Sequence, residues 1–147
     1  MKFTNALIGA SPRHYIDLAR ACEAAGFDSV SLSDHVFSPQ ELSSAYPYTR
    51  DGKPVILADV DWPDPWVTVG AMAAATSTLR FMTNVYILPL RNPFVVAKAV
   101  GTAAVLSDNR VSLGVGAGWM KEEFDQMEQP FSARGKRMNE MIVALVV

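Results

Sequence analysis

The sequence predicts an α/β protein with a parallel sheet covered by helices. Apolar segments of strand length alternate four times with segments whose apolar residues recur at helical spacing. Such alternation is typical of parallel strands joined by right-handed helical crossovers. Half of the 147 residues are hydrophobic and only 19% are charged, which suits strands that are buried on both faces.

The first strand-helix unit is predicted over residues 2–26. Residues 2–8 form a short strand. Ser11 and Pro12 are typical of a helix start, because serine caps free backbone N–H groups and proline is tolerated at the first helical position. Apolar residues then recur at helical spacing until Gly26, which we expect to end the helix.

The second and third units repeat this pattern. A strand around residues 30–32 is followed, after a long loop, by an alanine-rich helix over 65–76. The third strand is predicted over 80–88, and Asn92 with Pro93 begins the next helix. Both units therefore add a parallel strand and a covering helix.

The fourth unit combines a strand over 110–115 with three spaced glycines, Gly114, Gly116 and Gly118. Glycines at a strand end indicate either a ligand that approaches the backbone or close packing against a neighbouring helix. A dinucleotide fingerprint is disfavoured, because Trp119 occupies the position of its third glycine. A short helix over 121–127 and a final amphipathic helix follow.

Two architectures fit this order of elements: a doubly wound sheet, and half of an eight-stranded barrel. The chain is shorter than the roughly 250 residues typical of a complete barrel. Residues 141–147, MIVALVV, would leave the last helix with an apolar face and no following strand to cover it. We therefore expect residues 1–147 to be one domain of an incomplete barrel that continues beyond residue 147.

Composition excludes several classes of protein. A net charge of −2 gives no electrostatic basis for binding nucleic acid or a membrane surface. No apolar run reaches the length of a membrane span, and the N-terminus lacks the pattern of a signal peptide. The single cysteine, Cys22, rules out an internal disulfide. We expect a cytoplasmic protein, in which the basic residues 134–137 form a solvated helical turn or, alternatively, a phosphate clamp.

The loop between residues 34 and 64 is much longer than the usual two to six residues. It contains several prolines and, with the helix start that follows it, four aromatic residues: Tyr46, Tyr48, Trp62 and Trp66. The hypothesis is a lid whose rings line a substrate pocket and exclude water. The alternative is a loop that simply packs on the end of the sheet.

Asp34 and His35 stand where the second strand ends. Histidine can exchange a proton near neutral pH, and an adjacent carboxylate can accept a hydrogen bond from a ligand. The alternative is a turn and cap without a chemical role. No metal site is expected, because His14 and His35 are the only imidazoles and no metal-ligand spacing is present.

Several blocks in the same order resemble the luciferase-like superfamily of flavin and deazaflavin oxidoreductases. They are LSDHV at 32–36, DPWVTVGAMAAATSTLRFMTNVYILPLRNPFVVAKAV at 64–100, LGVGAGWMKEEF at 113–124 and FSARGKRMNE at 131–140. The resemblance implies a TIM (β/α)8 barrel of which the first four βα units are present. It also implies a cofactor, deazaflavin (coenzyme F-420) or FMN, at the carboxyl ends of the strands.

The resemblance assigns roles to individual residues. Asp34, Asn84, Val85, Gly116 and Gly118 match positions that bind or back the cofactor, with a cis peptide between Asn84 and Val85. His35 matches the proton-transfer residue beside the reacting carbon. A recurrent acidic position falls on Glu123, with Arg134 as its candidate partner. Tyr48, Trp62 and Trp119 complete the expected substrate pocket.

Departures from the family pattern limit what the resemblance implies. Trp119 replaces the carboxylic acid of the deazaflavin sugar-phosphate dehydrogenases, which disfavours their reaction. Asp108-Asn109 and Glu128 replace turn glycines. The main phosphate contacts of the family come from the second half of the barrel.

Three functions follow as hypotheses. The first is hydride transfer between reduced deazaflavin and a small-molecule substrate, catalysed by His35. The second is an FMN-dependent monooxygenase supplied by a partner flavin reductase, and the third is flavin binding without turnover. A homodimer is expected, because unpaired parallel strand edges favour further pairing.

Overall fold

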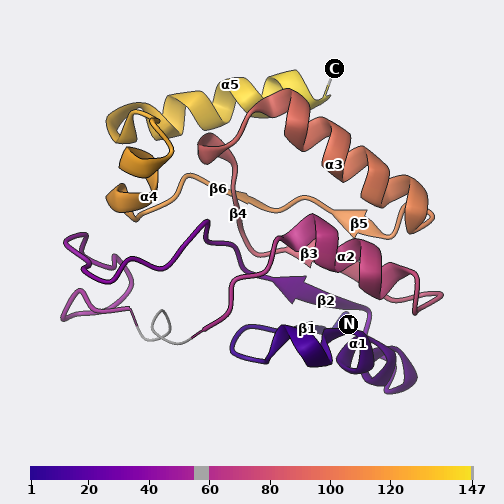
Figure 1. Cartoon of the computed structure of the whole chain (residues 1–147). Helices are drawn as coiled ribbons and strands as arrows, with labels where there is room; N and C mark the ends of the chain where they lie inside the picture. Colours follow the sequence, from indigo (N-terminus) through magenta and orange to yellow (C-terminus); the bar gives the residue numbers. More distant parts are fainter. Residues whose placement is uncertain (55–59, 147) are drawn as a thin grey trace.

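The computed structural model describes residues 1–54 and 60–146, and Figure 1 shows parallel strands with helices packed along them. One sheet has four parallel strands in the order β1 (Thr4–Ala6), β2 (Ser29–Leu32), β3 (Arg80–Thr83) and β5 (Val111–Ser112). A second parallel pair joins β4 (Tyr86–Ile87) to β6 (Val115–Gly116). The described strands follow their order in the sequence, without the reversal that defines a doubly wound sheet.

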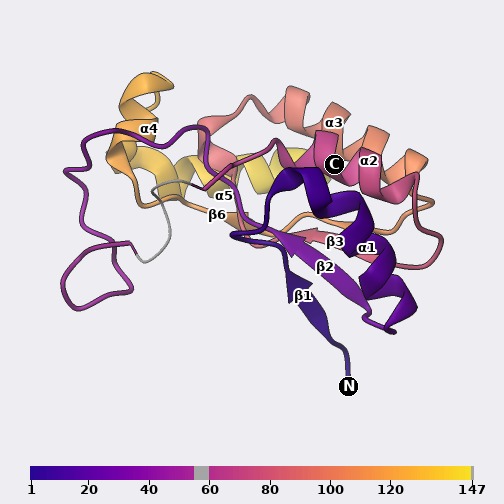
Figure 2. The same ribbon diagram turned by 60° about the horizontal axis from the view of Figure 1, so that its bottom comes forward.

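The long helices pack against one another in chain order. They are α1 (Tyr15–Ala24), α2 (Pro65–Ala73), α3 (Pro93–Leu106) and α5 (Arg134–Val146). Helix α1 contacts α2, α2 contacts α3, and α3 contacts α5, and Figure 2 shows α1, α2 and α3 on the same side of the four-stranded sheet. The predicted α/β class with a parallel sheet is confirmed.

Shorter elements complete the fold. A six-residue helix, α4 (Lys121–Gln126), lies between β6 and α5. Of the described 3-10 turns, η1 (Pro12–His14) precedes α1, η2 (Leu88–Leu90) follows β4, and η3 (Phe131–Ala133) precedes α5. Among the described residues, no helix is both long and apolar enough to cross a membrane. The structure describes the long loop between residues 34 and 64 except for residues 55–59, and the apolar end at 141–147 except for residue 147.

Helix starts follow the local sequence signals, with one exception. The side chains of Asp64 and Asn92 accept hydrogen bonds from the first N–H groups of α2 and α3. Ser11 makes no such bond, and the residues after it form the turn η1 instead. Helix α1 therefore begins at Tyr15, later than the predicted Pro12.

Three helices end with the same hydrogen-bond pattern, in which a residue of positive φ follows the last turn. At α1 this residue is Gly26, with φ 81°, as the sequence predicted. At α3 and α4 it is Asp108, with φ 54°, and Glu128, with φ 53°. The N–H of each of these residues and of its successor bonds back to carbonyls in the last helical turn, as in a Schellman motif.

The two predicted strands over 80–88 and 110–115 are each interrupted, which corrects their extent. The Asn84–Val85 peptide is cis, as the family resemblance implied, and separates β3 from β4. Gly114 separates β5 from β6, and both its N–H and its carbonyl oxygen bond to Thr83 Oγ1, at 3.0 and 2.8 Å. The segments β4 and β6 thus form a separate pair at the carboxyl end of the sheet.

Candidate functional site

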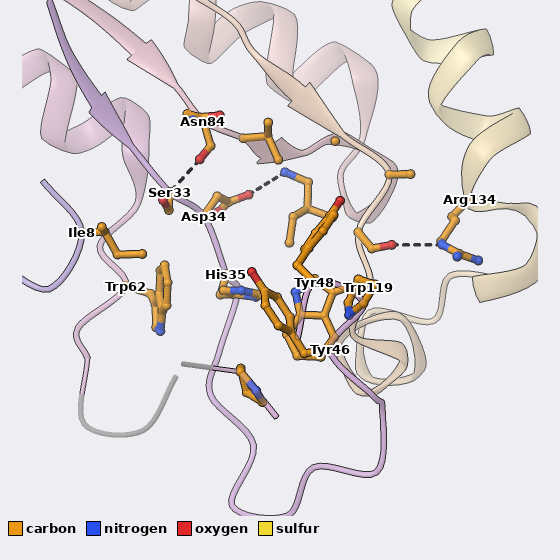
Figure 3. Close-up of a pocket in the computed structure, with 17 residues that line it drawn as sticks. Ile8, Ser33, Asp34, His35, Tyr46, Tyr48, Trp62, Asn84, Trp119 and Arg134 are labelled. Atoms are coloured by element: carbon orange, nitrogen blue, oxygen red, sulfur yellow. Dashed lines mark hydrogen bonds between the residues drawn. The ribbon is translucent and has the colours of Figure 1, made fainter. Parts of the chain in front are cut away.

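A pocket of about 580 Å³ lies at the carboxyl ends of the strands, and Figure 3 shows the side chains around it. Its lining includes every residue that the sequence predicted for the site: Asp34, His35, Tyr48, Trp62, Asn84, Val85, Gly116, Gly118 and Trp119. They come from the ends of β2, β3 and β6 and from the long loop. The structure brings these nine residues together, while the roles assigned to them stay predictions.

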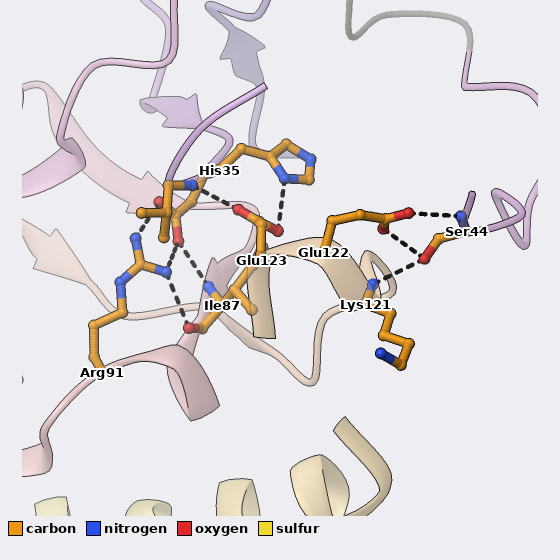
Figure 4. A network of polar contacts seen from close by, with 9 residues as sticks. His35, Ser44, Ile87, Arg91, Lys121, Glu122 and Glu123 are labelled. Atoms are coloured by element: carbon orange, nitrogen blue, oxygen red, sulfur yellow. Dashed lines mark hydrogen bonds and ion pairs between the residues drawn. The ribbon is translucent and has the colours of Figure 1, made fainter. Parts of the chain in front are cut away.

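His35 is held by a buried carboxylate. Its Nδ1 lies 3.1 Å from Oε2 of Glu123, whose side chain is fully buried in α4 (Figure 4). The other oxygen, Oε1, accepts the N–H of Val36 at 2.6 Å. An Nδ1–H that donates to the carboxylate fixes the tautomer of the ring and leaves Nε2 as the nitrogen available for proton exchange. The partner of Glu123 is therefore His35 rather than the expected Arg134.

Aromatic rings surround His35 on two sides. The Trp62 ring lies edge-on to the imidazole with centroids 4.7 Å apart, and the Trp119 ring lies edge-on at 6.0 Å. Tyr46 contacts both Trp119, at 5.0 Å, and Tyr48, at 5.4 Å. The imidazole thus lies in a largely apolar environment, as proton chemistry away from water requires.

Asp34 lines the pocket, but its carboxylate is used within the protein. Oδ2 accepts the N–H of Ile87 at 2.8 Å, and Oδ1 accepts Nη2 of Arg91 at 2.7 Å (Figure 4). Burial raises the pKa of the Asp34 carboxyl, against the opposing effect of the Arg91 guanidinium. In this arrangement Asp34 ties the end of β2 to β4 and to the turn after it.

The glycines have a packing reason that the sequence left open. A side chain at Gly114 would strike the Thr83 carbonyl, and one at Gly116 would strike the Val85 side chain. At Gly118, with φ 84°, it would meet Ile87 and Phe124. Close packing therefore explains all three positions, mainly against the neighbouring strand segments rather than the helix that we expected.

The long loop is anchored to α4 on the side of the pocket. The Glu122 carboxylate accepts the N–H and the hydroxyl of both Ser43 and Ser44, at 2.6 to 2.9 Å. Although burial alone would raise the pKa of Glu122, the serine hydrogen bonds lower it to about 2. The predicted lid aromatics Tyr46, Tyr48 and Trp62 line the pocket. Trp66 does not, because it is buried in α2 against Tyr86.

Lys136 is exposed at the start of α5, as expected for a solvated turn, but the two arginines beside it act differently from either expectation. Arg134 donates to the carbonyls of Gly118 and Phe131, and its guanidinium lies 3.9 Å from the centroid of the Phe131 ring. Arg137 donates to the carbonyls of Pro89 and Arg91. Both arginines join backbone segments around the pocket instead of forming a solvated turn or a phosphate clamp. Among the described residues, no cluster of potential metal ligands is present.

Sequence reasoning missed two residues of the site, Glu122 and Arg91, and it missed the pairing of Glu123 with His35. Glu123 follows Val36 by 87 residues, so no local spacing could reveal the contact. One signal was available in the sequence. Helical spacing in KEEF, residues 121–124, places Glu123 on the buried side of the helix, and a buried carboxylate needs a hydrogen-bonding partner.

The chain matches a known protein family. The family model for luciferase-like monooxygenases matches residues 3–146, so the chain belongs to this family. Its members among the curated relatives include an uncharacterized protein of Mycobacterium tuberculosis, which is 41% identical over 142 residues, 97% of this chain and 49% of the relative. The chain thus spans about half the length of this relative.

Two further proteins represent the two cofactor types. The F420-dependent glucose-6-phosphate dehydrogenase of Tsukamurella paurometabola is 33% identical over 136 residues, 89% of this chain and 36% of that protein. The structure of the oxygenating constituent of 3,6-diketocamphane monooxygenase from Pseudomonas putida, in complex with FMN, aligns with a TM-score of 0.73. That alignment covers 99% of this chain and 38% of the other at 19% identity, which shows the fold alone.

Proposed function

We propose that this chain carries the proton-transfer half of a deazaflavin-dependent oxidoreductase site, with His35 as the catalytic residue. The observation that carries the proposal is the pairing of His35 with the buried Glu123 at the end of an apolar pocket. The pairing leaves Nε2 available for proton exchange. A pocket of this volume falls within the roughly 300–1,000 Å³ that ligand sites occupy.

The described residues fit the ring of such a cofactor. Val85 is 40% exposed and lines the pocket beside the backbone of Gly116 and Gly118, which offers an apolar surface for a flat ring. Arg134, the cationic side chain of the described lining, is already bonded to carbonyl oxygens, so a phosphate tail finds no free cation there. We therefore place the ring, and not the phosphate tail, against these residues.

When bound, reduced deazaflavin supplies a hydride. A carbonyl substrate that accepts this hydride at carbon must also gain a proton at oxygen, and His35 gives that proton from Nε2 to yield the alcohol. In the opposite direction the alcohol loses the proton to Nε2. Glu123 stabilises the imidazolium and keeps the ring in place, so it is a positioning residue.

Deazaflavin is favoured over FMN by the 33% identity to the F420-dependent dehydrogenase. The substrate of that relative does not transfer with the cofactor, because Trp119 cannot supply a proton at the position where those dehydrogenases carry an acid. We also propose that the sequential strand order and the one-sided helices represent the first four units of a (β/α)8 barrel. A homodimer, a partner reductase and a cytoplasmic location stay predictions.

The first test is cofactor binding by the intact protein, measured by fluorescence titration with deazaflavin and with FMN. Binding of deazaflavin without FMN supports the proposal, and the opposite result replaces it with the monooxygenase hypothesis. Turnover is then followed by deazaflavin absorbance over a panel of small alcohols, aldehydes and ketones.

His35→Ala should lower turnover by roughly 10²- to 10⁴-fold, the usual contribution of a general acid or base, with cofactor affinity retained. Glu123→Gln should lower it less and shift the pH profile, which a purely structural residue would not do. Unchanged turnover in His35→Ala would reject His35 as the catalyst. Cofactor binding without any turnover would favour the non-catalytic alternative.

A further inference from the structure

We infer that the substrate of this site is an uncharged molecule with an apolar body, bound against an aromatic wall made by Tyr46, Tyr48 and Trp119. The inference rests on the proposed function and adds the class of substrate. It is carried by the partial exposure of these rings, by the absence of a free charge beside them in the described lining, and by the way the wall is held in place.

The wall is a partly exposed aromatic surface: Tyr46 and Trp119 are half-buried and Tyr48 is exposed. Tyr46 packs edge-on to Trp119 and to Tyr48, with interplanar angles of 77° and 74°. Tyr48 remains 82% exposed at the end of this series, although it lines the pocket. The series continues through Trp119 to His35. A substrate that lies against the wall therefore covers apolar surface while its reacting atom reaches the imidazole.

The charged side chains of the described lining are all engaged with other protein groups. Asp34 is paired with Arg91, and Arg134 donates to the carbonyls of Gly118 and Phe131. His35 is paired with Glu123. A phosphate or carboxylate on the substrate would lose water next to the wall without meeting a free cation, which is costly. An alcohol or carbonyl compound meets no such penalty.

The wall is fixed before the ligand arrives. Ser44, two residues before Tyr46, donates both its N–H and its hydroxyl to Glu122, and its Oγ accepts the N–H of Lys121 at 2.9 Å (Figure 4). Ser43 donates twice to the same carboxylate. Ordering the loop in advance lowers the entropy that binding would otherwise cost. Glu122 is thus a positioning residue for the wall, although it lies outside the pocket lining.

The inference is tested by ligand binding to the intact protein, followed by quenching of tryptophan fluorescence. Benzyl alcohol and benzyl phosphate form a matched pair that differs in charge. We expect benzyl alcohol to bind at least tenfold more tightly, and Tyr46→Leu to weaken it by roughly tenfold, the scale of one lost aromatic contact. Equal or tighter binding of benzyl phosphate would overturn the inference.

The anchor is tested with three variants. Glu122→Ala should raise KM for benzyl alcohol several-fold with little change in kcat, and Glu122→Gln, which keeps one acceptor oxygen, should recover part of the loss. Glu41→Gln, in the same loop, is the control and should leave KM unchanged. If Glu122→Ala folds normally and retains the parent KM, Glu122 does not position the wall.

Cofactor titration of the same samples separates this inference from the proposed function. Deazaflavin binding together with a preference for benzyl phosphate would reject the substrate class alone. If the protein does not bind deazaflavin but still prefers benzyl alcohol to benzyl phosphate, the proposed function alone is rejected.

Discussion

Two glutamates hold loops at opposite ends of the sheet in the same way, but with different consequences. Glu23, at the end of α1, accepts the N–H groups of Ser77, Thr78 and Leu79 at the amino end. Glu122, at the carboxyl end, accepts four hydrogen bonds from two serines. The pKa of each carboxyl is lowered to about 2.

The difference lies in what each loop carries. The turn held by Glu23 leads into Leu79, which is 1% exposed and belongs to the core. The loop held by Glu122 leads into Tyr46 and Tyr48, whose rings face a pocket. The same interaction therefore holds a core segment at the amino end and the rings that line a pocket at the carboxyl end, which is the division of roles expected for barrels of parallel strands.

The largest effect is expected at Arg110, which strengthens the amino end. Its guanidinium donates to the carbonyls of Ala73, Thr76, Leu79 and Ser107, at 2.7 to 3.0 Å. Arg110→Ala leaves these partly buried oxygens without a donor and should lower the free energy of unfolding by about 3 kcal/mol. Urea unfolding measures the change.

Arg80→Ala is the matched control for this prediction, because Arg80 is an exposed arginine in the neighbouring strand. It should change the free energy of unfolding by less than about 0.5 kcal/mol. Equal losses in the two variants would show that the amino end does not depend on the Arg110 hydrogen bonds.

An acid titration combined with a binding assay compares the two glutamates. A carboxyl whose pKa is lowered by folding stabilises the folded state above its unfolded pKa, and this stability is lost as the pH falls. For Glu23 the backbone N–H groups of Thr78 and Leu79 lower the pKa from 4.5 to about 2, so the loss should occur between these values.

Glu23→Gln should therefore flatten the dependence of unfolding free energy on pH between about 4.5 and about 2. Glu122→Gln should flatten it to a similar extent, because folding lowers the pKa of both carboxyls to about 2, but only Glu122→Gln should also weaken ligand binding at neutral pH. Urea unfolding at a series of pH values measures both slopes. If Glu23→Gln weakened ligand binding as much as Glu122→Gln does, the proposed division between the two ends would be wrong.

The sequence predicted the order of elements because each depends on local signals. Asn92 with Pro93 and Gly26 mark helix ends through interactions within a few residues. The breaks within two predicted strands involve a contact between adjacent strands, Thr83 with Gly114. The periodicity of residues along a single strand cannot predict such a contact. Only the family resemblance placed the cis peptide at Asn84–Val85.

The site was predictable where strands end and unpredictable where distant residues meet. Parallel strands bring their carboxyl ends to one edge, so His35, Val85 and Gly116 could be expected together. The pairing of His35 with Glu123 depends on how α4 packs beneath the loop, which spacing does not specify. Trp66 was misplaced because the loop ends at Asp64, whose side chain caps α2 and directs the next residues into the core.

The smallest effect concerns the helix ends and tests whether stability can be added at either end of the sheet. Asp108 and Glu128 adopt positive φ at the position where α1 uses Gly26. A residue with a Cβ is strained in this conformation, whereas glycine is not. Asp108→Gly and Glu128→Gly should each raise the free energy of unfolding by up to about 1 kcal/mol. This is the net gain, since glycine also increases the entropy of the unfolded chain and so offsets part of the relieved strain. Thermal unfolding measures the shift.

Gly26→Ala is the reciprocal variant, because space is open around Gly26 and only the backbone conformation opposes a side chain. It should lower stability by about 1 kcal/mol. Since Asp108 lies at the amino end and Glu128 follows α4, which carries Glu122, Glu128→Gly should also leave benzyl alcohol binding unchanged if the wall depends on the Glu122 anchor. A loss of binding in Glu128→Gly would instead show that the end of α4, and not its Glu122 anchor, determines the position of the wall.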